Sequence, residues 1–261
     1  MRRILPPGAR QLTVEDVFHD LAFPEPPPDR PYTVLNFVST LDGRTTLGDT
    51  GARFIGSAVD HRVMQRLRTV ADGLLHGAGT VRLDNFPPRV PPDLIHERLA
   101  RGLAEQPLGA VVTRSGNLSP DLKYFSLRPP VVFTTTARQA AVAEKLGAKA
   151  TVYGVGSESF DLAAALKILR MRCEIRVLLC EGGPKLTHGL IAAGLVDELF
   201  LTLAPKISGD TEALGLVAGP RFKPPEVPRV TLLDVLEHDG ELFLRYRLNP
   251  EPVALGNGAA S

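Results

Sequence analysis

The sequence lacks the features that mark nucleic-acid-binding, secreted and membrane-spanning proteins. Its 30 basic and 29 acidic side chains give a net charge of +1, without the basic excess that binding to a phosphate backbone demands. Tryptophan is absent, and the two cysteines, Cys173 and Cys180, do not indicate a disulfide framework. No apolar run approaches the roughly 18 residues that cross a bilayer, and no apolar signal-peptide segment follows the first arginines. We expect a cytoplasmic protein with a small-molecule partner and no nucleic-acid or membrane partner.

Motifs for metal binding and nucleophilic catalysis are also missing. The histidines form no His-x-x-x-His pair, and the cysteines have no metal-ligand spacing, so no metal is expected. Gly-x-Ser-x-Gly does not occur, which removes the usual signal of a serine hydrolase.

What is present is alternation of strand and helix patterns, which predicts an α/β fold with a central, mostly parallel sheet and helices on both faces. Asp239-Gly240 predicts a hairpin, so the sheet should end in an antiparallel C-terminal hairpin. Residues 1–30 are predicted to form a proline-rich N-terminal arm, 31–248 one domain, and 249–261 a disordered C-terminal tail. The expected strands are Tyr32–Ser39, Gly73–His76, Gly109–Thr113, Pro130–Thr135, Lys149–Tyr153, Ile175–Cys180, Leu199–Leu203, Val230–Glu237 and Leu242–Leu248.

Helix signals fill several of the gaps. Ser57 can cap a helix whose apolar residues recur at helical spacing, and Asp161 can cap Leu162–Arg172. Pro184 suits the first turn of a helix that Gly194 can end. The stretch Pro87–Pro92 is predicted as a surface loop.

The strongest local feature is Cys180-Glu181-Gly182-Gly183-Pro184-Lys185-Leu186, where a buried strand runs through two glycines into a helix. Glycine lets a phosphate approach backbone N–H groups at the helix N-terminus, although a plain tight turn would need glycine as well. Gly77-Ala78-Gly79-Thr80 is a second glycine turn after a strand, but it lacks the third glycine of a dinucleotide fingerprint.

Two further strand ends carry polar residues. Thr113-Arg114-Ser115 could hold a 2′-phosphate, or Arg114 could be a solvated loop arginine. Asp42-Gly43 favours a structural turn, with a catalytic role of Asp42 as the alternative. For His76, a satisfied core histidine is the favoured interpretation over a residue that faces the pocket.

In their order and spacing, these segments resemble the pyrimidine reductase family of riboflavin biosynthesis, the reductase half of the bifunctional deaminase/reductase. The matching stretches are Ser39–Arg44, Arg66–Arg68, His76–Val81, Glu181–Pro184, Gly194–Leu199, Ala204–Lys206 and Gly209. The resemblance covers residues 31–248 and implies a dihydrofolate-reductase-like fold, a homodimer and NADPH as the cofactor. The implied reaction converts 5-amino-6-(5-phosphoribosylamino)uracil to its ribitylamino product, by hydride addition at C1′ of the ribose.

The resemblance also assigns site residues. Glu181 is implied as the catalytic, substrate-side carboxylate and Arg68 as the residue that grips the substrate phosphate. The implied substrate contacts as a set are Asn36, Asp42, Arg68, Arg89 and Glu181. The implied cofactor contacts are Val38, Thr40, Phe54, Gly77, Gly79, Thr80, Asp84, Thr113, Arg114, Gly182, Gly183, Pro184, Lys185 and Leu186.

The chain departs from the family pattern on the substrate side. The zinc deaminase signature is missing, so deamination is expected on another chain. Asn36 stands where a lysine is usual, Ala52 replaces a polar contact, and Asn85-Phe86-Pro87-Pro88-Arg89 replaces an acidic-proline loop. Two alternatives therefore remain: the same fold and cofactor with a substrate such as dihydrofolate, or a non-catalytic nucleotide-binding homologue. A dihydrofolate site wants a buried acid on the first crossover helix, which offers only Asp60, near its start.

Overall fold

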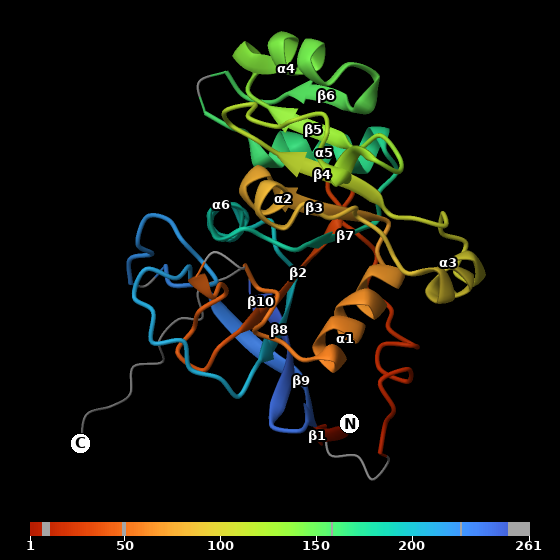
Figure 1. Cartoon of the computed structure of the whole chain (residues 1–261), viewed down its shortest axis with the longest axis vertical. Helices are drawn as coiled ribbons and strands as arrows, with labels where there is room; N and C mark the ends of the chain where they lie inside the picture. Colours follow the sequence, from red (N-terminus) through yellow and green to blue (C-terminus); the bar gives the residue numbers. More distant parts are fainter. Residues whose placement is uncertain (7–10, 49–50, 158, 225, 250–261) are drawn as a thin grey trace.

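A single ten-stranded sheet organises the molecule, which we describe from a computed structural model covering residues 1–6, 11–48, 51–157, 159–224 and 226–249. The strand order is β1-β9-β10-β8-β2-β7-β3-β4-β5-β6, and Figure 1 shows the sheet running from β6, beside α4, to β1 near the N-terminus. The strands are β1 (Arg2–Leu5), β2 (Tyr32–Ser39), β3 (Gly73–Gly77), β4 (Leu108–Val112), β5 (Val131–Thr134), β6 (Thr151–Gly154), β7 (Val177–Cys180), β8 (Glu198–Leu203), β9 (Arg229–His238) and β10 (Glu241–Asn249). The helices are α1 (Ala58–Thr69), α2 (Ala78–Asp84), α3 (Ile95–Ala100), α4 (Gln139–Leu146), α5 (Leu162–Arg172) and α6 (Pro184–Ala192).

The sheet is parallel from β8 through β2 to β6, and antiparallel where β10 joins β8 and β9. This arrangement confirms the predicted fold class, including the C-terminal hairpin. The nine predicted strands are all present, with ends that differ by a few residues. The sequence patterns did not reveal β1, which pairs with the distant strand β9.

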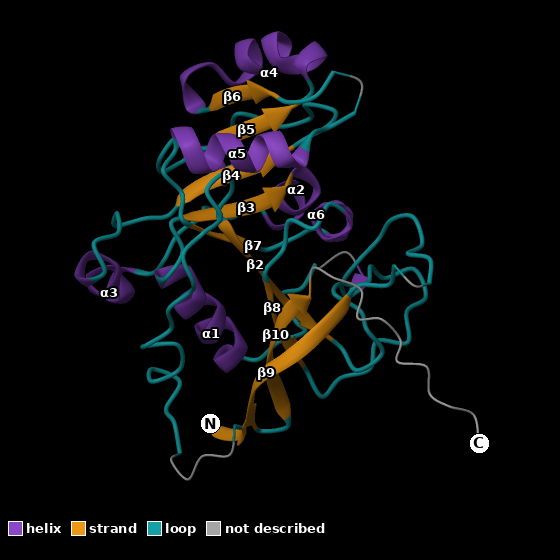
Figure 2. Cartoon of the chain, turned by 180° about the vertical axis from the view of Figure 1, so that it is seen from behind, coloured by secondary structure: helices purple, strands orange, loops and turns teal. Residues whose placement is uncertain are grey.

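Both faces of the sheet are covered because its central strands are apolar on both sides. Val34 and Leu74 pack with α1, whereas their chain neighbours Leu35 and Leu75 belong to the core under α5 and α6. Figure 2, seen from behind, shows α5 crossing this second face. The alternation of faces along a strand thus explains the continuous apolar runs in the sequence.

Helix boundaries follow the sequence signals. The Ser57 hydroxyl accepts hydrogen bonds from the N–H groups of Val59 and Asp60, and the Asp161 carboxylate caps α5 in the same way. Pro184 occupies the first turn of α6. No helix in the described ranges is long and apolar enough to cross a membrane.

The N-terminal segment packs closely against the domain. Val17 and Leu21 are 2% and 7% exposed, within apolar clusters that include residues of α1. The predicted tail lies outside the described residues from position 250 onward, and Asn249 is the last residue of β10.

Candidate active site

A cavity of about 1810 Å³ opens at the carboxyl ends of β2, β3, β4 and β7, between α1, α2 and α6. This is the edge where ligands gather in parallel sheets. It brings together most of the residues that the sequence assigned to a site: Asn36, Val38, Phe54, Arg68, Gly77, Gly79, Thr80, Asp84, Arg89, Thr113, Arg114, Glu181, Gly183, Pro184, Lys185 and Leu186 all line it.

Three assigned residues do not line the cavity: Thr40, Asp42 and Gly182. Asp42 accepts hydrogen bonds from the Thr40 hydroxyl at 2.6 Å and from the backbone N–H groups of Ser208 and Gly209 at 3.0 and 2.9 Å. These bonds lower the pKa of the Asp42 carboxyl, and they tie one turn to the loop after β8. Thr40 and Asp42 therefore hold the turn, which is the role that the Asp-Gly pair favoured.

Two glycine turns meet at the floor of the cavity. The N–H of Gly77 donates to the carbonyl of Gly182 at 2.7 Å. A Cβ on Gly77 would lie 3.3 Å from the Gly183 nitrogen, and one on Gly183 would lie 3.1 Å from the Thr80 hydroxyl oxygen. Glycine therefore suits this close approach, and the backbone at the half-buried Gly183, at the start of α6, carries no side chain. An anion such as a diphosphate fits this position.

Cationic and hydroxyl groups lie at one end of the cavity. Arg114 and Ser115 follow β4, and Arg138 follows the neighbouring parallel strand β5. The Thr113 hydroxyl accepts a hydrogen bond from the Gly116 N–H at 3.0 Å, which fixes the turn that carries Arg114. The exposed Arg114 guanidinium is thus presented on an ordered turn rather than on an unstructured loop.

A buried ion pair lies in the cavity wall beside the glycine turn at Gly182 and Gly183. Arg68, on α1, donates from Nε and Nη2 to the two carboxylate oxygens of Glu181, each at 2.7 Å, and from Nη1 to the Arg89 carbonyl at 3.0 Å. His76 Nε2 lies 2.8 Å from Glu181 Oε2. Although burial alone would raise it, the pKa of Glu181 is lowered, because the Arg68 charge and these hydrogen bonds outweigh the desolvation.

This ion pair changes which arginine is available to bind a substrate phosphate. Arg68, predicted to grip a phosphate, is 7% exposed, and its guanidinium is bonded to Glu181 and to the Arg89 backbone. Arg89 itself lines the cavity with an exposed side chain. The loop Pro87–Pro92, predicted as surface, also contributes to the wall, and its Val90 is 1% exposed.

Asp60 is a further acid in the cavity. Burial raises its pKa to about 6, and the negative charge of Glu241 adds to the effect, while a hydrogen bond from Thr202 and the charge of Lys206 oppose it. The sequence contains a signal for this position, because Asp60 lies three residues before Val63 and seven before Leu67 and therefore shares their inward face of α1. Within the described ranges, no cluster of three or more His, Cys, Asp or Glu side chains could hold a metal.

Comparison with known proteins connects this chain to one group of enzymes. The family model described as the RibD C-terminal domain matches residues 31–244. A 2,5-diamino-6-ribosylamino-4(3H)-pyrimidinone 5′-phosphate reductase of Methanothermobacter thermautotrophicus is 32% identical over 192 residues, which are 73% of this chain and 85% of the relative. The riboflavin biosynthesis protein RibD of Aquifex aeolicus is 27% identical, and the match spans 50% of its length.

Solved structures agree in fold. A pyrimidine reductase-like protein of Corynebacterium diphtheriae superimposes with a TM-score of 0.71 at 23% identity, covering 85% of this chain and 93% of that one. RibD of Acinetobacter baumannii gives 0.70 at 23% identity, over 85% of this chain and 58% of its own.

Proposed function

We propose that this chain, which belongs to the RibD C-terminal domain family, reduces a phosphoribosylamino-pyrimidine with NADPH in riboflavin biosynthesis. The proposed substrate is 5-amino-6-(5-phosphoribosylamino)uracil. The 2,5-diamino compound in the names of the archaeal relatives is the other member of the same substrate class. One observation carries the proposal: a single cavity joins the glycine turns at the α6 N-terminus to the Arg68–Glu181 pair.

The residues fit a nicotinamide dinucleotide. Gly77 and Gly183 leave backbone bare where a Cβ would intrude, and Thr80 lies beside them, which suits a diphosphate. Arg114 and Arg138 lie toward the neighbouring strand ends, where a 2′-phosphate would distinguish NADPH from NADH. When bound, the cofactor supplies a hydride, and the protein orients both reactants.

The Glu181 carboxylate acts as an acceptor rather than as an acid. Its lowered pKa keeps it ionised near neutral pH, so it can bind an N–H or O–H group of the substrate but has no proton to give. Arg89 binds the substrate phosphate in this proposal, because the Arg68 guanidinium is already bonded to Glu181.

The decisive experiment follows NADPH oxidation with the uracil substrate, the diamino substrate and dihydrofolate in turn. Turnover of either ribosylaminopyrimidine supports the proposal, and faster turnover of dihydrofolate would replace it. NADPH binding without turnover of any of the three would indicate a non-catalytic homologue. Dihydrofolate is a specific second candidate because Asp60, an acid on the first crossover helix, does line the cavity.

The cofactor preference has its own test. Arg114→Ala should weaken NADPH binding on the order of 10- to 100-fold, the value of one charge-assisted hydrogen-bonded contact, and leave NADH binding unchanged. Arg128→Ala, an exposed arginine outside the cavity, is the matched control. Equal losses for both cofactors in Arg114→Ala would remove the 2′-phosphate role.

We also propose a homodimer. A second groove, of about 400 Å³, is lined mainly by apolar residues of α6, β8, β9 and the segment Leu216–Phe222. Val217 and Val230, 37% and 45% exposed, lie in it. Light scattering should give twice the chain mass of 28.1 kDa, and a monomer mass at micromolar concentration would refute the dimer.

A further inference from the structure

Behind the Arg68–Glu181 pair lies a buried chain of hydrogen-bonded side chains that has no role in the reaction as proposed so far. His76, on β3, is 0% exposed and lies between two partners. Its Nε2 is 2.8 Å from Glu181 Oε2, and its Nδ1 is 2.9 Å from the Tyr124 hydroxyl. Tyr124 is also 0% exposed, and its hydroxyl lies within donating distance of the Ala110 carbonyl, at 3.2 Å. The chain Tyr124–His76–Glu181–Arg68 therefore leads from the core to the cavity wall.

The protons on Glu181 and Tyr124 decide which group donates in each of these hydrogen bonds. Glu181 is ionised, so the 2.8 Å contact requires a proton on His76 Nε2. Burial and the neighbouring Glu181 charge raise the pKa of Tyr124 far above its usual value, so its hydroxyl keeps a proton to donate. The single Tyr124 proton has two possible acceptors, His76 Nδ1 at 2.9 Å and the Ala110 carbonyl at 3.2 Å. Assigning it to the shorter contact makes Tyr124 the donor to Nδ1 and leaves hydrogen on Nε2 of the imidazole.

One Glu181 oxygen keeps room for a second hydrogen bond. Oε2 accepts from both Arg68 Nη2 and His76 Nε2, whereas Oε1 accepts only from Arg68 Nε among the described residues. A carboxylate oxygen accepts two hydrogen bonds readily, so Oε1 retains capacity. Glu181 lines the cavity, and this oxygen is its available acceptor.

The loop Asn85–Arg89, which follows α2 and departs from the family pattern, covers these hydrogen-bonded side chains. The Phe86 ring lies edge-on to His76 at 5.1 Å and to Tyr124 at 6.2 Å, and the Arg68 guanidinium lies over it at 5.4 Å. Arg68 Nη1 holds the same loop through the Arg89 carbonyl. Burial raises the pKa of Asp84, a further carboxyl on α2.

We propose that His76 is a positioning residue for Glu181, that Tyr124 fixes the His76 tautomer, and that together they present Glu181 Oε1 to the substrate. The inference rests on the proposed function, since it concerns the substrate end of the same cavity. It assigns His76 and Tyr124 no contact with substrate or cofactor. Their effect passes through the carboxylate alone.

The first test needs no substrate. Nitrogen-15 NMR of the histidine rings, with His76→Gln to assign the signal, should show a singly protonated His76 ring with hydrogen on Nε2. Tyr124→Phe keeps the ring shape and removes only the hydroxyl, and it should shift the Nδ1 resonance. A ring protonated on Nδ1 alone, a doubly protonated ring, or a signal unchanged in Tyr124→Phe would overturn the proposal.

The second test is kinetic. Tyr124→Phe should lower turnover about tenfold, the value of one lost buried hydrogen bond, without changing the Kd for NADPH. His76→Leu should lower it further, and His76→Gln, which keeps an N–H donor toward Glu181, should recover part of the loss. Tyr32→Phe is the matched control, because Tyr32 donates to Glu198 at 3.0 Å and does not line the cavity.

The outcomes separate this inference from the proposed function. If the wild-type protein reduces no ribosylaminopyrimidine, the function falls and the NMR result alone decides the positioning role. If it does, equal turnover in Tyr124→Phe and Tyr32→Phe overturns the inference while the function stands. A parallel loss of turnover and NADPH affinity in Tyr124→Phe also overturns it, because that pattern marks general disruption of the cavity.

Discussion

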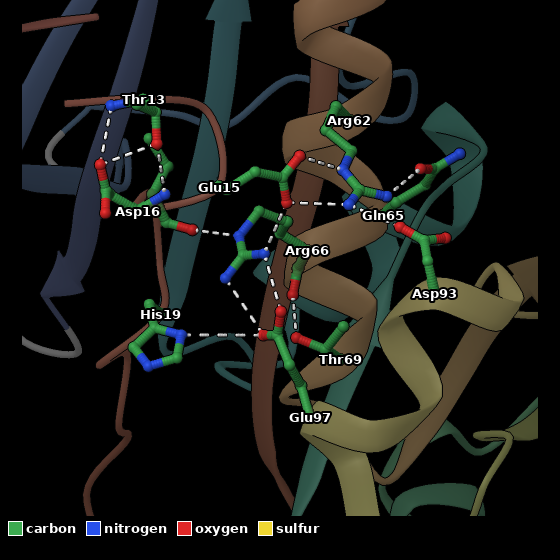
Figure 3. Close-up of polar contacts among 11 residues, drawn as sticks. Thr13, Glu15, Asp16, His19, Arg62, Gln65, Arg66, Thr69, Asp93 and Glu97 are labelled. Atoms are coloured by element: carbon green, nitrogen blue, oxygen red, sulfur yellow. Dashed lines mark hydrogen bonds and ion pairs between the residues drawn. The ribbon is translucent and has the colours of Figure 1, made fainter.

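Arg66 offers a direct test of how the N-terminal arm and α3 hold α1, the helix that carries Asp60 and Arg68 into the cavity. The Arg66 side chain is 1% exposed, and it donates to both carboxylate oxygens of Glu97, at 3.0 and 3.1 Å (Figure 3). Its Nε donates to the Val17 carbonyl of the arm at 2.6 Å. Arg66→Met keeps the apolar stem and removes the cation, which leaves Glu97 without its main partner.

The magnitude follows from burial. Breaking a buried ion pair costs about 3–5 kcal/mol, and since the Glu97 side chain is 14% exposed and can recover some hydration, we expect the lower end, about 3 kcal/mol. Arg62→Met on the same helix is the control: its partners Glu15 and Asp93 are 53% and 59% exposed, so the loss should be below about 1 kcal/mol. Urea unfolding followed by circular dichroism measures both. Equal losses in the two variants would refute the reasoning.

Two further substitutions probe the cavity itself. The pKa of Asp60 is raised to about 6 in the folded protein, so the unfolded chain loses this proton at a lower pH. The free energy of unfolding therefore falls as the pH rises from about 4 to 6. Asp60→Asn should raise that free energy at pH 7 by on the order of 2–3 kcal/mol and change it little at pH 4. Gly182→Ala places a Cβ 2.9 Å from Phe37 at a φ of +89°, so it should lower the unfolding free energy by about 2 kcal/mol. Gly79→Ala, with nothing within 4 Å, should leave stability intact and weaken NADPH binding, and a stable Gly182→Ala would contradict the packing argument.

The sheet was predictable because its information is local. Runs such as Val177–Cys180 are apolar at every position, which is typical of strands covered on both faces. The missed strand β1 shows the limit of that signal. Its four residues gain strand structure from pairing with β9, more than 200 positions away, and Arg2 and Arg3 carry no apolar pattern.

The site residues also differ in how far the sequence alone predicts their roles. The glycine turns at Gly77 and Gly183 carry their signal in the residue type, because a Cβ at either position would crowd a neighbouring atom, at 3.3 and 3.1 Å. The partners of Glu181 have no such signal: Arg68 lies 113 positions away in the chain, and His76 lies 105 away. An arginine that binds a phosphate and one that binds a buried carboxylate look alike until the fold supplies the neighbour.

The two acids of the cavity show what the fold adds to residue identity. Glu181 sits against a buried guanidinium and an imidazole, and its pKa falls; Asp60 faces Glu241 from within a desolvated wall, and its pKa rises to about 6. Near neutral pH the first group can only accept hydrogen bonds, whereas the second can exchange a proton. The proposed hydride addition at C1′ of the ribose needs both capacities, since one group must hold the substrate while another gives a proton to the ring oxygen that is released. Both carboxyls are buried, which raises the pKa of each; the Arg68 cation beside Glu181 reverses that effect, whereas the surroundings of Asp60 do not.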